Sequence, residues 1–204
     1  MTKLPRGLAV IVCALSLVSC SGILPTGGPA PKLYTLTPAH DFPADLPRLT
    51  QQLLVETPDA SAALDTTSVA LRRNGISIDY FADVAWTDSA PAMVQNLLVN
   101  SFVRSGRAMA VARETLALRG DFILRPELRH FEADYGNNET IPTIRIEMGL
   151  LLIRMPDRTI VASHTVSATA KPTENATPAI FIAFDQALQQ ALRESVQWTL
   201  ATTK

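Results

Sequence analysis

Alternation of apolar and polar residues is the clearest pattern in the chain, and it lies in the second half. It is longest over residues 143–154, where the apolar residues on one face are Ile144, Ile146, Met148, Leu150 and Leu152. Side chains of a strand point alternately to opposite faces, so this period of two predicts a long strand with one buried face. Similar strands are predicted at residues 121–131 and 159–170. Three consecutive strands joined by short turns form an antiparallel meander.

The first half of the chain predicts shorter strands. They cover residues 32–37, 51–57, 67–72, 76–81 and 109–112. The dipeptide Asn74-Gly75 separates the third of these strands from the fourth, and Asn-Gly is the strongest short signal for a β-hairpin. Pro58-Asp59 is expected to end the second strand in a turn.

Two segments have the period of an amphipathic helix. The first is expected to begin near Pro91, with Ser89 or Asp88 as its N-cap, and to end at Gly106. The second begins at residues 177–178, and its apolar stripe consists of Phe181, Phe184, Leu188, Ala191, Leu192, Val196 and Leu200. The elements together predict a single-domain α/β sandwich, in which two main helices cover a mixed, mostly antiparallel sheet of six to eight strands.

The N-terminus has the pattern of a lipoprotein signal peptide over residues 1–19. Lys3 and Arg6 precede an apolar stretch of about a dozen residues, which is shorter than the ~20 that span a bilayer. The segment Leu-Val-Ser-Cys, ending at Cys20, resembles the bacterial lipobox, in which cleavage leaves the cysteine as a lipidated N-terminus. Residues 20–31 are rich in proline and glycine and predict a flexible tether, so the folded domain is expected at residues 32–204.

Charge and cysteine content narrow the classes of function. Removal of residues 1–19 takes away Lys3 and Arg6 and no acidic residue, so the net charge changes from −1 to −3. A weakly negative protein is not expected to bind nucleic acid. The mature chain keeps one cysteine, Cys20, which lipid blocks, so stability must come from a packed core rather than from a disulfide.

The sequence lacks common motifs of catalysis and of cofactor binding. The sequence has no glycine-rich phosphate loop, no Gly-x-Ser-x-Gly and no Cys-x-x-Cys. The strongest metal-like pattern is His130, Glu132 and Asp134, which share one face of a regular strand. The apolar positions change phase between Leu128 and Phe131, which indicates a β-bulge that would spoil this alignment. We therefore interpret the cluster as a polar strand end, and expect no metal or cofactor.

For three further residues the sequence allows two hypotheses about burial and role. His164 lies on the apolar face of its predicted strand and is expected to be a buried, hydrogen-bonded histidine, and the alternative is a functional histidine. Trp86 and Trp198 are expected to pack in the core or at a helix end, and the alternative is a place at a partner surface, where aromatic residues are enriched.

The order of these features resembles the ABC-type transport auxiliary lipoprotein family. The resemblance covers about residues 34–200, and the segments that carry it are KLYTL, IDYFADVAWTDSAPAMVQNLLVNSF, GDFILRPELRHFEADY, IRIEMGLLLI, ASHTVSATA and the final WTL. The order of elements carries it, together with the aromatic approach to the first helix at Tyr80 and Trp86. The segment at residues 81–85 is less regular than expected for the family.

The resemblance implies a function without catalysis. Such lipoproteins accompany an ABC permease, its ATPase and an MCE-domain substrate-binding protein, and these systems move phospholipid or other hydrophobic molecules between the inner and outer membranes. Ser21 after Cys20 is similar to an outer-membrane sorting signal. Tyr34, Tyr80 and Trp86 become candidates for contact with a partner or with lipid. Some members of the family assemble into rings, and the sequence leaves the oligomeric state open.

The sequence is also compatible with two other functions. A structural or assembly lipoprotein would anchor at the outer membrane without touching cargo, and would show no apolar groove or exposed aromatic patch. A periplasmic hydrolase would place a serine or His130 in a pocket beside a partner base.

Overall fold

The structure, a computed structural model, describes residues 30–114, 119–137 and 139–203. Cys20, the signal peptide and the tether up to residue 29 lie outside the described residues. The strands are β1 (Lys32–Tyr34), β2 (Leu49–Val55), β3 (Asp59–Ala60), β4 (Ser68–Arg73), β5 (Ser77–Trp86), β6 (Ala108–Arg113), β7 (Phe122–Asp134), β8 (Thr143–Arg154) and β9 (Thr159–Ala170). The helices are α2 (Ala90–Ser105) and α3 (Thr177–Thr202). None of the described helices is both long and apolar enough to cross a membrane.

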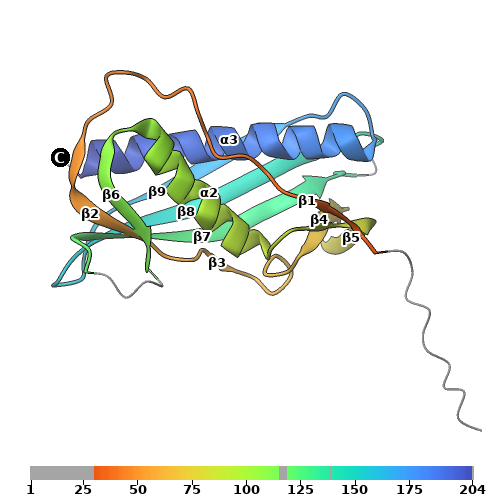
Figure 1. Ribbon diagram of the computed structural model, residues 1–204. Coiled ribbons are helices and arrows are strands. Elements are labelled where there is room, and N and C mark those ends of the chain that lie inside the picture. Colours follow the sequence, from red (N-terminus) through yellow and green to blue (C-terminus); the bar gives the residue numbers. More distant parts are fainter. Residues whose placement is uncertain (1–29, 115–118, 138, 204) are drawn as a thin grey trace, which may run out of the picture. The chain divides into compact units, whose positions relative to one another are not determined.

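The strand β7 organises a mixed sheet of nine strands (Figure 1). One edge of β7 pairs along its whole length with β8 in antiparallel orientation, and β8 pairs likewise with β9. The other edge of β7 pairs in parallel with β2, β3 and β4 in turn. The predicted α/β fold, with its long antiparallel meander, is confirmed. The nine strands exceed the expected six to eight because residues 59–60, predicted as a turn, pair with β7.

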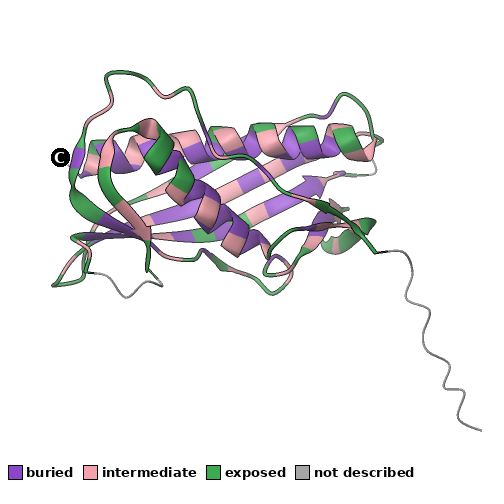
Figure 2. Ribbon diagram, viewed as in Figure 1, coloured by how far each residue is buried: buried purple, intermediate pink, exposed green. Residues whose placement is uncertain are grey.

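Both helices lie on one face of the sheet, and the core lies between them and the strands (Figures 1 and 2). The helix α3 packs on β8 and β9, and α2 packs on β2, β6 and α3. The alternating residues of β8 point into this core as predicted, and Ile144, Ile146 and Leu152 are fully buried. A small second apolar cluster of Leu54, Ile123 and Ile153 lies on the opposite face.

The ends of α2 confirm the predicted signals. Ser89 is the N-cap residue, Pro91 lies in the first turn, and Gly106 ends the helix in the left-handed conformation with φ 61°. The amide of Gly106 donates a hydrogen bond to the carbonyl of Val103, which satisfies one carbonyl of the last turn. The Ser89 side chain makes no capping hydrogen bond.

The predicted phase change in β7 is a β-bulge. The pairing register with β8 shifts between Leu128 and His130. The shift turns Phe131 toward the helices, where it is 1% exposed, and leaves the side chain of Glu132 on the opposite face of the sheet.

The strands β1 and β5 differ from their predicted lengths. The strand β1 ends at Tyr34 rather than residue 37, because the amide of Thr37 donates to Asp185 Oδ1 of α3 at 2.7 Å instead of joining the sheet. The strand β5 continues to Trp86 through an irregular stretch in which Asp83 has φ 59°. This irregularity lies in the segment that was less regular than expected for the family.

Candidate functional site

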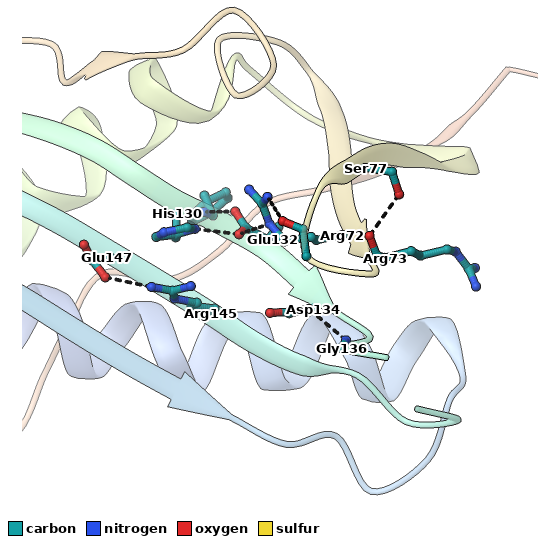
Figure 3. A network of polar contacts seen from close by, with 11 residues as sticks. Arg72, Arg73, Ser77, His130, Glu132, Asp134, Gly136, Arg145 and Glu147 are labelled. Carbon is teal, nitrogen blue, oxygen red and sulfur yellow. Dashed lines mark hydrogen bonds and ion pairs between the residues drawn. The ribbon is translucent and has the colours of Figure 1, made fainter. Parts of the chain in front are cut away.

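We define the open face of the sheet as the side of β7, β8 and β9 that faces away from the helices. Its most buried polar residue is Glu132, which is 1% exposed. Arg72 Nε of β4 donates to Glu132 Oε1 at 3.0 Å, and His130 Nδ1 lies 2.7 Å from the same oxygen (Figure 3). Glu132 Oε2 accepts from the amide of Phe131 at 2.9 Å. The carboxylate thus links β4 to β7, and burial is offset by these partners.

The predicted cluster of three metal-like residues is only partly assembled. His130 and Glu132 touch, but Asp134 Oδ1 accepts from the amide of Gly136 at 2.8 Å (Figure 3). Within residues 30–114, 119–137 and 139–203, no group of three or more His, Cys, Asp or Glu residues is placed to hold a metal ion. Glu132 is buried and paired with Arg72, so the segment is not simply a polar strand end, and the expected absence of a metal stays a prediction.

A second group of charges lines a shallow depression of about 540 Å³ on the open face. Arg125 Nη2 donates to Glu56 Oε1 at 3.0 Å, and a second contact joins Arg125 Nε to Glu56 Oε2. This hydrogen bonding and the charge of Glu56 raise the pKa of Arg125 above its ordinary value. Arg129 pairs with Glu127 at 2.8 Å. The lining therefore alternates in sign instead of presenting one charge.

Gly149 makes room for the ion pair at the centre of this depression. A Cβ atom at this position would lie 2.7 Å from Arg129 Nη2 and 3.2 Å from Glu127 Oε2. A side chain at this position would displace the guanidinium of Arg129 from its place across β8. The depression is open, and its lining combines charged side chains with the apolar residues Leu150 and Leu151.

The predicted aromatic residues do not form one exposed patch. Trp86 is 1% exposed and packs against Phe131, Phe181 and Phe184 with ring centroids 5.1–5.4 Å apart, so its interpretation as a core residue is confirmed and a place at a partner surface does not fit. The other two candidates are more accessible. Tyr34 is half-buried and stacks on Phe181 at 3.6 Å.

Tyr80 is the only one of the three candidates that is strongly exposed. Its side chain lies on β5 and is 45% exposed, and its hydroxyl donates to the carbonyl of Ala63 at 3.2 Å. Cys20, the predicted lipidation site, lies outside the described residues.

His164 is less buried than predicted. Its side chain is 36% exposed, its Nε2 lies 3.0 Å from Glu194 Oε1, and its ring stacks on Trp198 at 5.4 Å. The strand β9 pairs only with β8 among the described strands, so the side chains of α3 cover its apolar face incompletely. The hydrogen-bonded part of the prediction agrees with the structure, and full burial was wrong.

Sequence reasoning missed Arg72, Arg129 and Gly149. A lone glycine inside a long alternating strand is a signal for close approach of another group, and it could have pointed to Gly149. The pairing of Arg72 with Glu132 joins residues 60 positions apart, and no local pattern marks it.

Tyr135, which directly follows β7, should make the stability of the domain depend on pH. It is 5% exposed, its hydroxyl donates to Asn175 Oδ1 at 2.8 Å, and burial raises its pKa above the ordinary value, while Arg73 and Asn175 act in the opposite direction. The neutral phenol is favoured in the folded state. Its contribution to stability is therefore complete below the unfolded pKa of about 10 and is lost as the pH rises through the folded pKa.

We expect Tyr135→Phe to lower the free energy of unfolding by about 1 kcal/mol at pH 7, because the bond to Asn175 is lost. The difference from the wild type should shrink above pH ~10, since phenylalanine does not ionise. Urea unfolding at neutral and alkaline pH measures both effects. A difference that stays constant across this range would contradict the assignment.

The sequence and the fold are similar to those of known proteins. The model of a family described as ABC-type transport auxiliary lipoprotein component matches residues 34–195. The crystal structure of protein XCC0632 from Xanthomonas campestris is 31% identical, covers 84% of this chain and 95% of that chain, and has a TM-score of 0.79. A solved structure of an uncharacterized protein, 15% identical, covers 84% of this chain and 99% of that chain with a TM-score of 0.63, and supports the fold alone.

A curated relative extends beyond the matched region. Uncharacterized protein bll6063 from Bradyrhizobium diazoefficiens is 30% identical over 177 residues, which are 85% of this chain and 46% of that protein. The chain thus spans about half the length of this relative. The family model covers most of the domain, from the last residue of β1 into the C-terminal half of α3. The chain belongs to the family of ABC-type transport auxiliary lipoprotein components.

Proposed function

We propose that this protein is the outer-membrane lipoprotein accessory of an MCE-type ABC system that moves phospholipid or other hydrophobic molecules between the two membranes. The family match over residues 34–195 is the observation that carries the proposal. The lipobox ending at Cys20 and the following Ser21 support lipidation and outer-membrane sorting. The protein acts in this proposal without catalysis and without a cofactor.

The chemistry of the open face favours docking over direct carriage of cargo. A protein that carries lipid needs an enclosed apolar groove, whereas the depression around Gly149 is open and places the charged residues Arg125, Arg129, Asp59 and Glu127 beside Leu150 and Leu151. Charges of both signs give specificity and orientation to a contact between two proteins. In this proposal the open face binds the MCE-domain protein at the outer membrane, and cargo passes beside it. An assembly lipoprotein with no cargo contact is the second function that this face favours.

A pull-down from detergent-solubilised membranes tests the proposal. Tagged wild-type protein should fractionate with the outer membrane and recover an MCE-domain protein with its permease and ATPase. Cys20→Ala should leave the membrane, because the mature chain has no other cysteine to carry lipid. A membrane-bound wild type that recovers no such partner would refute the transport role and leave the assembly role.

A matched pair of variants tests the open face itself. Arg129→Glu reverses one charge in the depression, and Arg104→Glu reverses an exposed charge on α2, on the helical side of the sheet. We expect only Arg129→Glu to reduce recovery of the MCE-domain protein. Equal recovery with both variants would rule out the depression as the docking face.

A further inference from the structure

We infer that the turn between β4 and β5 is a second membrane contact, which places the side chain of Ile76 among the lipid headgroups beside the anchor. The inference rests on the lipid anchor at Cys20 that the proposed function includes. The turn consists of Asn74, Gly75 and Ile76, between the paired residues Arg73 and Ser77. We call these three residues the hairpin tip.

Ile76 is an unusual residue for this position. Its side chain is 92% exposed, the highest value among the large apolar residues that are exposed in the described chain. Turns usually take Gly, Pro, Asn, Asp or Ser, because these residues fit the backbone or bond to it, and a β-branched apolar side chain does neither. The exposed apolar side chain is unfavourable in water and would be stabilised by transfer to an apolar environment.

The hairpin tip is held firmly enough to present this side chain. Asn74 and Gly75 have φ of 53° and 70°, as the two central residues of a tight hairpin turn require. The amide of Asn74 donates to the carbonyl of Gly136 at 2.9 Å, and Arg72 Nη1 donates to the carbonyl of Gly75 at 3.1 Å. These bonds tie the tip to the body of the domain, so Ile76 projects from a braced loop.

The direction of β1 brings the chain in from the side of the hairpin tip. The strand β1 runs parallel to β5, and Lys32 lies opposite Val84 near the end of β5. The chain before Lys32 therefore approaches from the direction in which β5 begins, which is the hairpin tip. Figure 1 shows the chain entering β1 at the end of the sheet where β4 and β5 lie.

The length of chain before β1 limits the distance between the domain and the anchor. Twelve bonds between Cα atoms join Cys20 to Lys32, which reach at most about 40 Å when fully extended. A domain held this close to a bilayer, whose first strand is entered from the side of the hairpin tip, can bring that tip to the membrane as a second contact. The exposed charges on this side balance, since Asp79 and Asp83 accompany Arg73 and Lys32. The apolar side chain of Ile76 therefore carries the proposed contact.

The exposed edge of β5 is less suited to pairing with a strand of another protein. The part of β5 before Val84 pairs with β4 on one side and not with β1 on the other. Asp79 is exposed there, and Asp83 has φ 59°, which breaks the regular strand. Charges and bulges on an edge oppose the addition of a strand. The hairpin tip, rather than the strand edge, is the accessible feature.

Site-specific fluorescence tests the contact on the full lipidated chain. Because Cys20 is blocked by lipid, Ile76→Cys adds a unique thiol for a polarity-sensitive nitrobenzoxadiazole label. Met109→Cys is the matched control, since Met109 is 73% exposed and lies on β6 at the other end of the strand order. Both proteins are reconstituted into vesicles of phosphatidylethanolamine and phosphatidylglycerol, with or without nitroxide-labelled lipid.

We expect the label at residue 76 to shift its emission to the blue in vesicles and to be quenched by nitroxide lipid, while the label at residue 109 does neither. Co-flotation with unshifted emission at residue 76 would overturn this inference and leave the anchor intact. Equal shifts at both positions would also overturn it, because they would show unspecific adsorption. Failure to float with the vesicles would overturn the anchor and this inference together.

Discussion

Trp86→Ala should lower the free energy of unfolding by about 3–5 kcal/mol, the largest loss expected from a single substitution in this domain. Trp86 is 1% exposed, and its ring touches Phe131 of β7 and two phenylalanines of α3, Phe181 and Phe184. Removal of the indole would leave a cavity where the end of β5, the central strand and the long helix meet. Since domains are stable by about 5–15 kcal/mol, the variant should be close to unfolding.

Trp198→Ala is the matched control for this prediction. Trp198 is half-buried and stacks on the partly exposed His164, so its loss should cost clearly less. The chain has two tryptophans, and each variant therefore leaves a single fluorescent reporter. Urea unfolding followed by fluorescence and circular dichroism measures both variants. Trp86→Phe keeps an aromatic ring, so this variant should fold and show a smaller loss of stability than Trp86→Ala. Equal losses for the two alanine variants would contradict the central role of Trp86.

Glu132→Ala is expected to cost about 3 kcal/mol, because removal of one partner leaves the others of a buried pair without compensation. Arg72 and His130 would both lose their shared acceptor, and the amide of Phe131 would lose its bond to the carboxylate. The value lies at the lower end of the range for buried pairs, since the Arg72 side chain is 19% exposed and water can reach it.

Two comparisons separate this effect from simple truncation of a side chain. Glu147 lies opposite His130 on β8 and pairs with Arg145, but its side chain is 21% exposed, so Glu147→Ala should cost about 1 kcal/mol or less. The double variant Arg72→Met with Glu132→Leu should recover much of the lost stability, because it removes both charges. A double variant as unstable as Glu132→Ala would refute a charge-based origin of the loss.

Local patterns predicted the elements that depend on residue spacing. The alternation in β8 identified its buried face, because a strand places every second side chain on the same side. Pro91 and Gly106 marked α2, and Asn74-Gly75 marked the hairpin, because these residues fit special backbone geometries. The change of phase in the apolar positions before Phe131 predicted the bulge, because an extra residue in a strand reverses the faces of the residues that follow it.

Contacts between distant residues decided the candidate site. Arg72 bonds to Glu132 because β4 pairs in parallel with the end of β7. Gly149 lies close to the guanidinium of Arg129 because β8 pairs with β7. The burial of Trp86 likewise depends on α3, which lies about 100 residues away in the sequence. No pattern along the chain carries these pairings.

The sequence by itself determined the α/β class, most element boundaries, the lipobox at Cys20 and the family resemblance, because each depends on the spacing of neighbouring residues. Only the tertiary structure decided that β7 shares one edge among β2, β3 and β4, that β1 ends when Thr37 bonds to Asp185, and that Ile76 lies on the side from which the chain enters. These outcomes depend on which partners the rest of the fold brings within hydrogen-bonding distance.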